Sequence, residues 1–124
     1  MSENILEKII KNKEKKIDIL KKSLSIESLK IKINENKSFI DFKDKIKKNE
    51  RNGKISIIAE IKKASPSAGL IIEKYDPVDI ADIYNKNKAT CLSVLTEEDF
   101  FLGDLTHISK IKKEINLPIL CKDF

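Results

Sequence analysis

Residues 55–124 alternate between short β-branched apolar runs and amphipathic helical patterns, and this alternation limits the possible folds more than any other feature. Three runs, at 55–62, 89–95 and 117–124, predict strands, and the first is expected to be buried on both faces. Asp76-Pro77 predicts the start of a helix between the first two runs, because Asp caps free amides and Pro suits the first helical position. This order of elements predicts right-handed βαβ units and a parallel sheet.

The predicted sheet has two possible forms, open or closed into a barrel, and periodicity alone does not choose between them. No GxGxxG follows a predicted strand, and GxxxxGK[ST] is absent. The nucleotide-binding forms of an open sheet therefore lose most of their support. The segment 63–69 is predicted to be a loop by its composition.

The first part of the chain predicts helices, so we expect a helical extension over 1–54 and the βαβαβ segment over 55–124. Ser25 is a candidate helix cap, a further helix is expected over 41–50, and Asn52-Gly53 ends it. The apolar residues of the first helix recur at spacings of three, four and seven: Ile5, Leu6, Ile9, Ile10, Ile17, Leu20 and Leu24.

The net charge of +5 comes entirely from the predicted extension. Residues 1–54 carry 16 basic and 9 acidic side chains, whereas residues 55–124 carry 9 basic and 11 acidic ones. Nearly all the basic residues are lysines, and nucleic-acid surfaces usually use Arg and stacking aromatics. A solvated helix face is the better interpretation, and nucleic-acid binding is the weaker alternative. We expect no nucleic-acid partner.

Targeting signals and oxidised cysteines are not expected. No apolar run approaches the ~20 residues of a membrane helix, and the N-terminus has the features of neither a signal peptide nor a transit peptide. Cys91 and Cys121 lie in apolar runs and are expected to be buried, reduced thiols. We therefore expect a cytoplasmic protein without membrane contact.

Charged side chains lie near the ends of two of the predicted strands. Glu60 and Lys62 are two residues apart near the end of the first strand and so share a face, and Lys122 lies near the end of the third. Lysines at such strand ends serve as general acids, Schiff-base nucleophiles or clamps for phosphate and carboxylate groups. The alternative is a pair of ordinary lysines that reach solvent. The lone His107 is expected to be exposed on a helix surface.

Three segments carry a specific resemblance. Residues 57–71 (IIAEIKKASPSAGLI), 92–103 (LSVLTEEDFFLG) and 117–124 (LPILCKDF) closely resemble the first three strands and loops of indole-3-glycerol phosphate synthases, in family order and spacing. Glu-x-Lys-x-x-Ser-Pro-Ser is the most specific of these motifs. The helical extension resembles that of the family only loosely, and Ala68 stands where many members have a lysine or another polar residue.

The resemblance implies a (βα)8 TIM barrel of the phosphate-binding type, of which this chain holds the first three strands. It implies a carboxy-lyase of tryptophan biosynthesis that turns 1-(2-carboxyphenylamino)-1-deoxyribulose 5-phosphate into indole-3-glycerol phosphate, with no metal or organic cofactor. Lys122 would be the main general acid, Lys62 would contact anionic groups and assist dehydration, and Glu60 would orient both. Binding residues would be Ser65, Phe101 and Phe124.

The same resemblance implies that the later strands carry the general-base glutamate and the phosphate cradle. We therefore expect a chain that stops at residue 124 to be a truncated record, and to be inactive and poorly soluble alone. The alternative is a non-catalytic half that associates with a separate, complementary C-terminal half.

Overall fold

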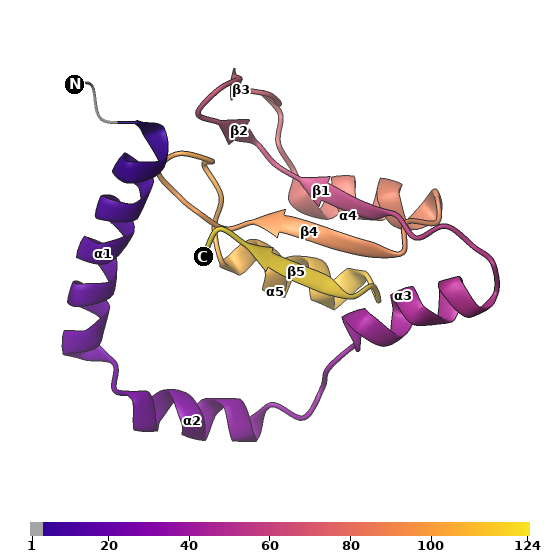
Figure 1. Cartoon of the computed structure of the whole chain (residues 1–124), viewed down its shortest axis with the longest axis horizontal. Helices are drawn as coiled ribbons and strands as arrows, with labels where there is room; N and C mark the ends of the chain where they lie inside the picture. Colours follow the sequence, from indigo (N-terminus) through magenta and orange to yellow (C-terminus); the bar gives the residue numbers. More distant parts are fainter. Residues whose placement is uncertain (1–3) are drawn as a thin grey trace. The chain divides into compact units, whose positions relative to one another are not determined.

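The computed structural model describes residues 4–124 (Figure 1). The chain divides into two units, Met1–Phe39 and Ile40–Phe124. The described part of the first unit consists of α1 (Ile5–Ser23) and α2 (Ile26–Glu35). Asn4 caps α1 and Ser25 caps α2, each through a side-chain oxygen that accepts a backbone N–H of the first turn. Both predicted helices are thus confirmed, and neither has a buried residue.

The second unit begins with α3 (Phe42–Arg51), which Asp41 caps and which ends at Asn52. The Asn49 side-chain amide donates to the hydroxyls of Ser56 (3.1 Å) and Thr90 (3.2 Å), at the amino ends of two strands. Helix α3 is therefore tied to the sheet. The division at residues 54 and 55 rests on the change from helical patterns to strand-forming runs, and it stays a prediction.

The main sheet contains three parallel strands in the order β1 (Ile58–Ile61), β4 (Cys91–Leu95) and β5 (Ile119–Lys122). This confirms the predicted α/β class with a parallel sheet. Every strand is shorter than its apolar run, because a run does not reveal which backbone groups are paired. The Ile57 N–H, for example, donates to the Thr90 side chain at 2.9 Å instead of joining the strand ladder.

Helices α4 (Pro77–Lys86) and α5 (Thr106–Glu114) pack on one face of this sheet (Figure 1). Asp76 accepts the N–H groups of Val78 and Asp79, and Pro77 occupies the first turn, as the sequence predicts. The core between helices and sheet consists of buried apolar side chains: Ala59, Ile61, Ala81, Leu92, Val94, Ile111, Ile115 and Leu117. Burial of this apolar surface is the main stabilising contribution to the unit.

The other face of the sheet is covered unevenly. All of β4 is buried, but Ile58 of β1 is 48% exposed and Leu120 of β5 is 45% exposed. The prediction of a strand buried on both faces, made for residues 55–62, is therefore wrong for β1, whereas β4 is buried throughout. The reason is position, since β1 and β5 are the outer strands of the sheet.

The segment predicted as a loop after β1 contains a small hairpin. Strands β2 (Ala64–Ser65) and β3 (Gly69–Leu70) pair antiparallel, with Ser65 opposite Gly69. Gly69 has a φ of +66°, a left-handed conformation that glycine adopts without steric cost. Two-residue strands have too little periodicity to be read from a sequence.

The burial of three side chains can be compared with the burial predicted for them. His107 is half-buried, with its ring centroid 5.7 Å from that of Tyr75, so the predicted exposed position is wrong. The ring of Tyr75, tilted by 57° to that of His107, comes from a distant loop that helical periodicity does not reveal. Cys91 is buried and Cys121 is partly exposed, and both are free thiols. Among the described residues, no helix has the length and apolarity to cross a membrane.

Candidate functional site

The structure brings Glu60, Lys62 and Lys122 together at the carboxyl ends of the parallel strands. The Lys62 Nζ lies 3.4 Å from Oε1 of Glu60, and the Lys122 Nζ lies 3.8 Å from Oε2 of the same carboxylate. One carboxylate thus joins the ammonium group of the residue that follows β1 to that of the last residue of β5. All three residues belong to the face of the sheet opposite α4 and α5.

Strand geometry explains why these residues meet. Side chains two apart on a strand share a face, which pairs Glu60 with Lys62. Strand β4 lies between β1 and β5, so the backbones that carry Glu60 and Lys122 are two strand spacings apart, about 10 Å. The residue of β4 opposite Glu60 is Ser93, whose small side chain leaves room for this contact.

The carboxylate of Glu60 is held from the middle strand. The Ser93 hydroxyl, which is 3% exposed as a residue, donates to Oε2 of Glu60 at 3.2 Å. On the other face, the Tyr84 hydroxyl of α4 donates to the backbone carbonyl of Glu60 at 3.0 Å. Glu60 is therefore fixed by both its side chain and its backbone.

The cluster carries a net positive charge and is partly open to water. The side chains of Lys62, Glu60 and Lys122 are 32%, 36% and 43% exposed. Ion pairs at such exposure contribute little to stability, on the order of 0–1 kcal/mol each. Two cations around one anion favour the approach of a negatively charged ligand. The chemistry of the cluster is therefore that of an anion site with available proton donors.

The loop after β4 adds two residues that the sequence analysis did not single out. Thr96 donates its N–H (3.0 Å) and its hydroxyl (3.1 Å) to the backbone carbonyl of Lys122. Glu97 is 2% exposed and accepts backbone N–H groups of its own loop. The available signal was their place directly after a largely apolar run, where polar groups become buried.

The predicted binding residues lie on neighbouring segments. Ser65 is buried in β2, and its hydroxyl accepts the Ala68 N–H at 3.1 Å, so it shapes its own turn. Phe101 is half-buried in the loop after β4, and Phe124, 79% exposed, lies two residues beyond Lys122. The ion pairs join the three charged residues, and the binding roles of the other three stay predictions.

A small pocket of about 220 Å³ adjoins this cluster. It is lined by Glu60 and Lys62 together with apolar residues and Tyr84: Ile61, Ile71, Ile72 and Ile80. Residues 4–124 contain no group of three His, Cys, Asp or Glu side chains placed to hold a metal ion.

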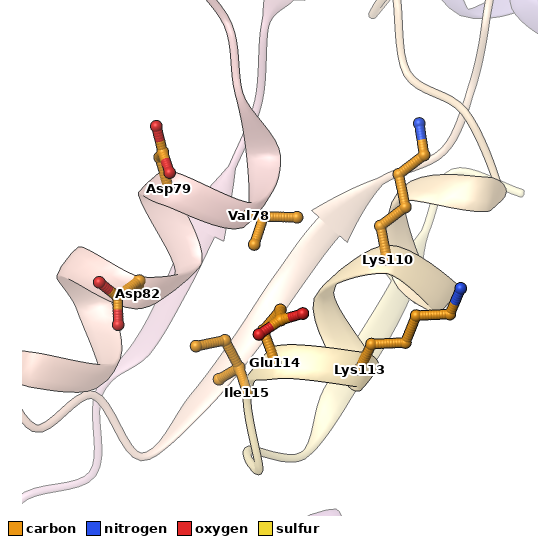
Figure 2. A pocket seen from close by; sticks show the side chains of 7 residues that line it. All are labelled: Val78, Asp79, Asp82, Lys110, Lys113, Glu114 and Ile115. Carbon is orange, nitrogen blue, oxygen red and sulfur yellow. The ribbon is translucent and has the colours of Figure 1, made fainter.

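A larger groove of about 580 Å³ lies between α4 and α5, on the helical side of the sheet (Figure 2). Asp79 and Asp82 of α4 stand on one side of it, and Lys110 and Lys113 of α5 stand on the other (Figure 2). Size alone would favour this groove. We favour the strand ends as the functional site, because the charged cluster and its hydrogen bonds converge there.

The fold and the cluster define an α/β protein with a cationic site at the carboxyl ends of its parallel strands. A family model described as indole-3-glycerol phosphate synthase matches residues 6–124, and the chain belongs to this family. The resemblance carried by the three motifs is thereby confirmed.

Curated relatives named indole-3-glycerol phosphate synthase agree with this assignment. The protein of Trichodesmium erythraeum (strain IMS101) is 42% identical over 121 residues, which are 98% of this chain and 40% of the relative. The protein of Desulforamulus reducens (strain ATCC BAA-1160 / DSM 100696 / MI-1) is 46% identical over 120 residues, 97% of this chain and 44% of the relative. The chain thus spans about two-fifths of the length of the curated relatives it matches.

Proposed function

We propose that this chain supplies the proton-donating part of an indole-3-glycerol phosphate synthase. The substrate is 1-(2-carboxyphenylamino)-1-deoxyribulose 5-phosphate, and the products are indole-3-glycerol phosphate, CO2 and water. The observation that carries the proposal is the pair of ammonium groups on the Glu60 carboxylate, at 3.4 and 3.8 Å, in a member of this family.

Lys122 is the general acid of ring closure. A carbon–carbon bond forms between the ring carbon that bears the carboxylate and the carbonyl carbon of the sugar chain. The carbonyl oxygen takes the proton of the Lys122 ammonium as this bond forms. Loss of CO2 then restores the aromatic ring. A positioned proton donor of this kind typically accelerates a step about 10²- to 10⁴-fold.

Lys62 binds the anionic groups of the substrate and donates a proton to the hydroxyl that leaves as water, while the general base of the later strands removes the proton of the neighbouring CH2 carbon. Fixed cations stabilise developing negative charge better than water does, because they need no reorganisation during the reaction. Glu60 orients both lysines, and Ser93 holds Glu60 in turn. Phe101 and Phe124 form part of the apolar wall around the aromatic ring, and Ser65 belongs to the loop that approaches the substrate.

The active form is a (βα)8 barrel in which further strands pair with β1 and β5. Three strands leave unpaired backbone edges, which favour association with other strands. The family resemblance places the general base and the phosphate cradle in the later strands. A polypeptide of residues 1–124 alone therefore gives no turnover and is poorly soluble.

The experiment completes the barrel. Residues 1–124 are fused to the part of the Desulforamulus reducens relative that follows the matched region, and product formation is followed by indole fluorescence. We expect turnover, a fall in kcat of about 10²-fold or more for Lys122→Gln, and a higher KM for Lys62→Gln. Lys112→Gln, an exposed lysine of α5, is the matched control and should behave as the unmodified hybrid.

Two results would contradict the proposal. A folded, soluble hybrid without turnover would exclude the activity, and a Lys122→Gln hybrid with full kcat would exclude the role of Lys122. The relative's segment alone is the background measurement.

The open edges of β1 and β5 also support a second candidate, a non-catalytic half that pairs with a separately made C-terminal half. Co-expression of residues 1–124 with the relative's segment as two chains tests it. Restored turnover and co-purification support this candidate, whereas no complex at micromolar concentrations counts against it.

A further inference from the structure

The loop after β4 contains a buried carboxylate that the proposed chemistry does not use. Oε1 of Glu97 accepts the N–H of Asp99 at 3.0 Å, and Oε2 accepts those of Phe100 and Phe101 at 2.6 and 3.1 Å. Glu97 is 2% exposed. Burial of a charge is costly unless hydrogen bonds replace its water, and three backbone amides provide that replacement here.

The loop contains an unusual backbone conformation. The Gly103 N–H donates to the backbone carbonyl of Glu97 at 2.7 Å, which closes the loop on itself. Leu102 has a φ of +53°, a left-handed conformation that leucine rarely adopts. Such a conformation persists only where surrounding contacts impose it. The carboxylate of Glu97 and the closing hydrogen bond supply these contacts.

The position of the loop connects it to the site. It leaves the carboxyl end of β4, the middle strand, between the strands that carry Glu60 and Lys122. Thr96, the residue before Glu97, holds the backbone carbonyl of Lys122. Two adjacent residues thus fix neighbouring parts of the site: Thr96 holds the end of β5 at Lys122, and Glu97 holds the loop that carries Phe101.

We propose that Glu97 is a positioning residue that sets the place of Phe101, and thereby the apolar wall for the aromatic half of the substrate. This inference rests on the proposed function. Glu97 acts through the Phe101 backbone and not on the reacting atoms. Glutamine does not replace it, because its amide group would turn a donor toward N–H groups that need an acceptor.

The first measurement is independent of catalysis. Amide hydrogen exchange is compared between the completed barrel, its Glu97→Gln variant and Glu73→Gln, a control that removes an exposed carboxylate from another loop. Charge-assisted hydrogen bonds of this kind protect amides strongly, so Glu97→Gln should accelerate exchange at residues 99–101 by about 10- to 100-fold. Glu73→Gln should leave these amides unchanged.

The second measurement asks whether Glu97 acts through Phe101. Glu97→Gln should raise KM by about 3- to 10-fold with a smaller change in kcat, as expected when uniform binding is lost. In a Phe101→Ala background, Glu97→Gln should raise KM little further, because the effects of residues that act as a unit are not additive. A residue that only stabilises the loop would give additive effects. If Glu97→Gln does not fold, Glu97→Asp takes its place in both measurements.

The outcomes separate this inference from the proposed function. Unchanged exchange at residues 99–101 overturns the role of Glu97 whether or not the hybrid is active. Faster exchange also overturns it if KM is unchanged, or if the effects of Glu97→Gln and Phe101→Ala on KM are fully additive. In either case Glu97 would hold the loop without serving the substrate. An inactive hybrid overturns the proposed function and, with it, the substrate role of the loop.

Discussion

The substitution Gly103→Ala would place a methyl group against the end of β4. A β-carbon at this position would lie 2.3 Å from the carbonyl oxygen of Leu95, 2.8 Å from its carbonyl carbon and 3.0 Å from the Cα of Thr96. All three are backbone atoms of buried residues, so no side-chain rotation relieves the contact. Either the loop or the strand end must move.

The cost follows from these contacts. Overpacking of a dense region costs about 1–3 kcal/mol. Displacement of Gly103 also stretches its N–H hydrogen bond to the Glu97 carbonyl, now 2.7 Å long, which adds about 1 kcal/mol. We therefore expect Gly103→Ala to lower the free energy of unfolding by about 2–4 kcal/mol.

Gly69→Ala is the matched control, because a β-carbon there meets nothing within 4 Å and only the φ of +66° opposes it. That backbone cost is about 1–2 kcal/mol. Urea unfolding of the completed barrel, followed by circular dichroism, gives both values. A smaller loss for Gly103→Ala than for Gly69→Ala would refute the steric argument.

Three further outcomes are expected in the same hybrid. Lys88 lies just after α4 with a φ of +64°, a conformation that glycine adopts without steric cost. Lys88→Gly should therefore raise the free energy of unfolding, measured in urea, by about 1 kcal/mol. Burial against Tyr75 lowers the pKa of His107, so the unfolded chain binds the proton first. The free energy of unfolding should therefore fall as pH drops below 6.5, the ordinary value, and His107→Phe should remove this part of the urea-monitored pH dependence. Ser93→Ala removes the hydroxyl that holds Glu60 and should lower kcat several-fold. Ser109→Ala, at an exposed position of α5, is the control and should leave kcat unchanged. Equal kcat values for the two variants would contradict the role of Ser93.

Local signals predicted the helices and the class of fold. The Asp76 cap is correctly predicted because its hydrogen bonds reach only to residues 78 and 79. Side-chain alternation along one strand likewise predicts that Glu60 and Lys62 share a face. The shared carboxyl end of parallel strands predicts that Lys122 lies at the same edge of the sheet.

Contacts between distant segments explain what the sequence did not reveal. The hydrogen bond from Ser93 to Glu60 depends on the register of two strands, which apolar runs do not specify. The tilted ring contact between His107 and Tyr75 joins a helix to a separate loop. The buried Glu97 reads in the sequence as one of several acids in a polar loop, since its burial depends on how that loop folds back.

The size of Ser93 has a consequence for how this family can vary. The side chains of Glu60 and Lys122 meet over the middle strand, from backbones about 10 Å apart. Ser93, the residue of β4 opposite Glu60, has a small side chain that leaves this space open. A valine or leucine there would fill the space above β4 and separate the carboxylate from the lysine. The small size of the residue at position 93 thus determines whether the two outer strands can share one charge network.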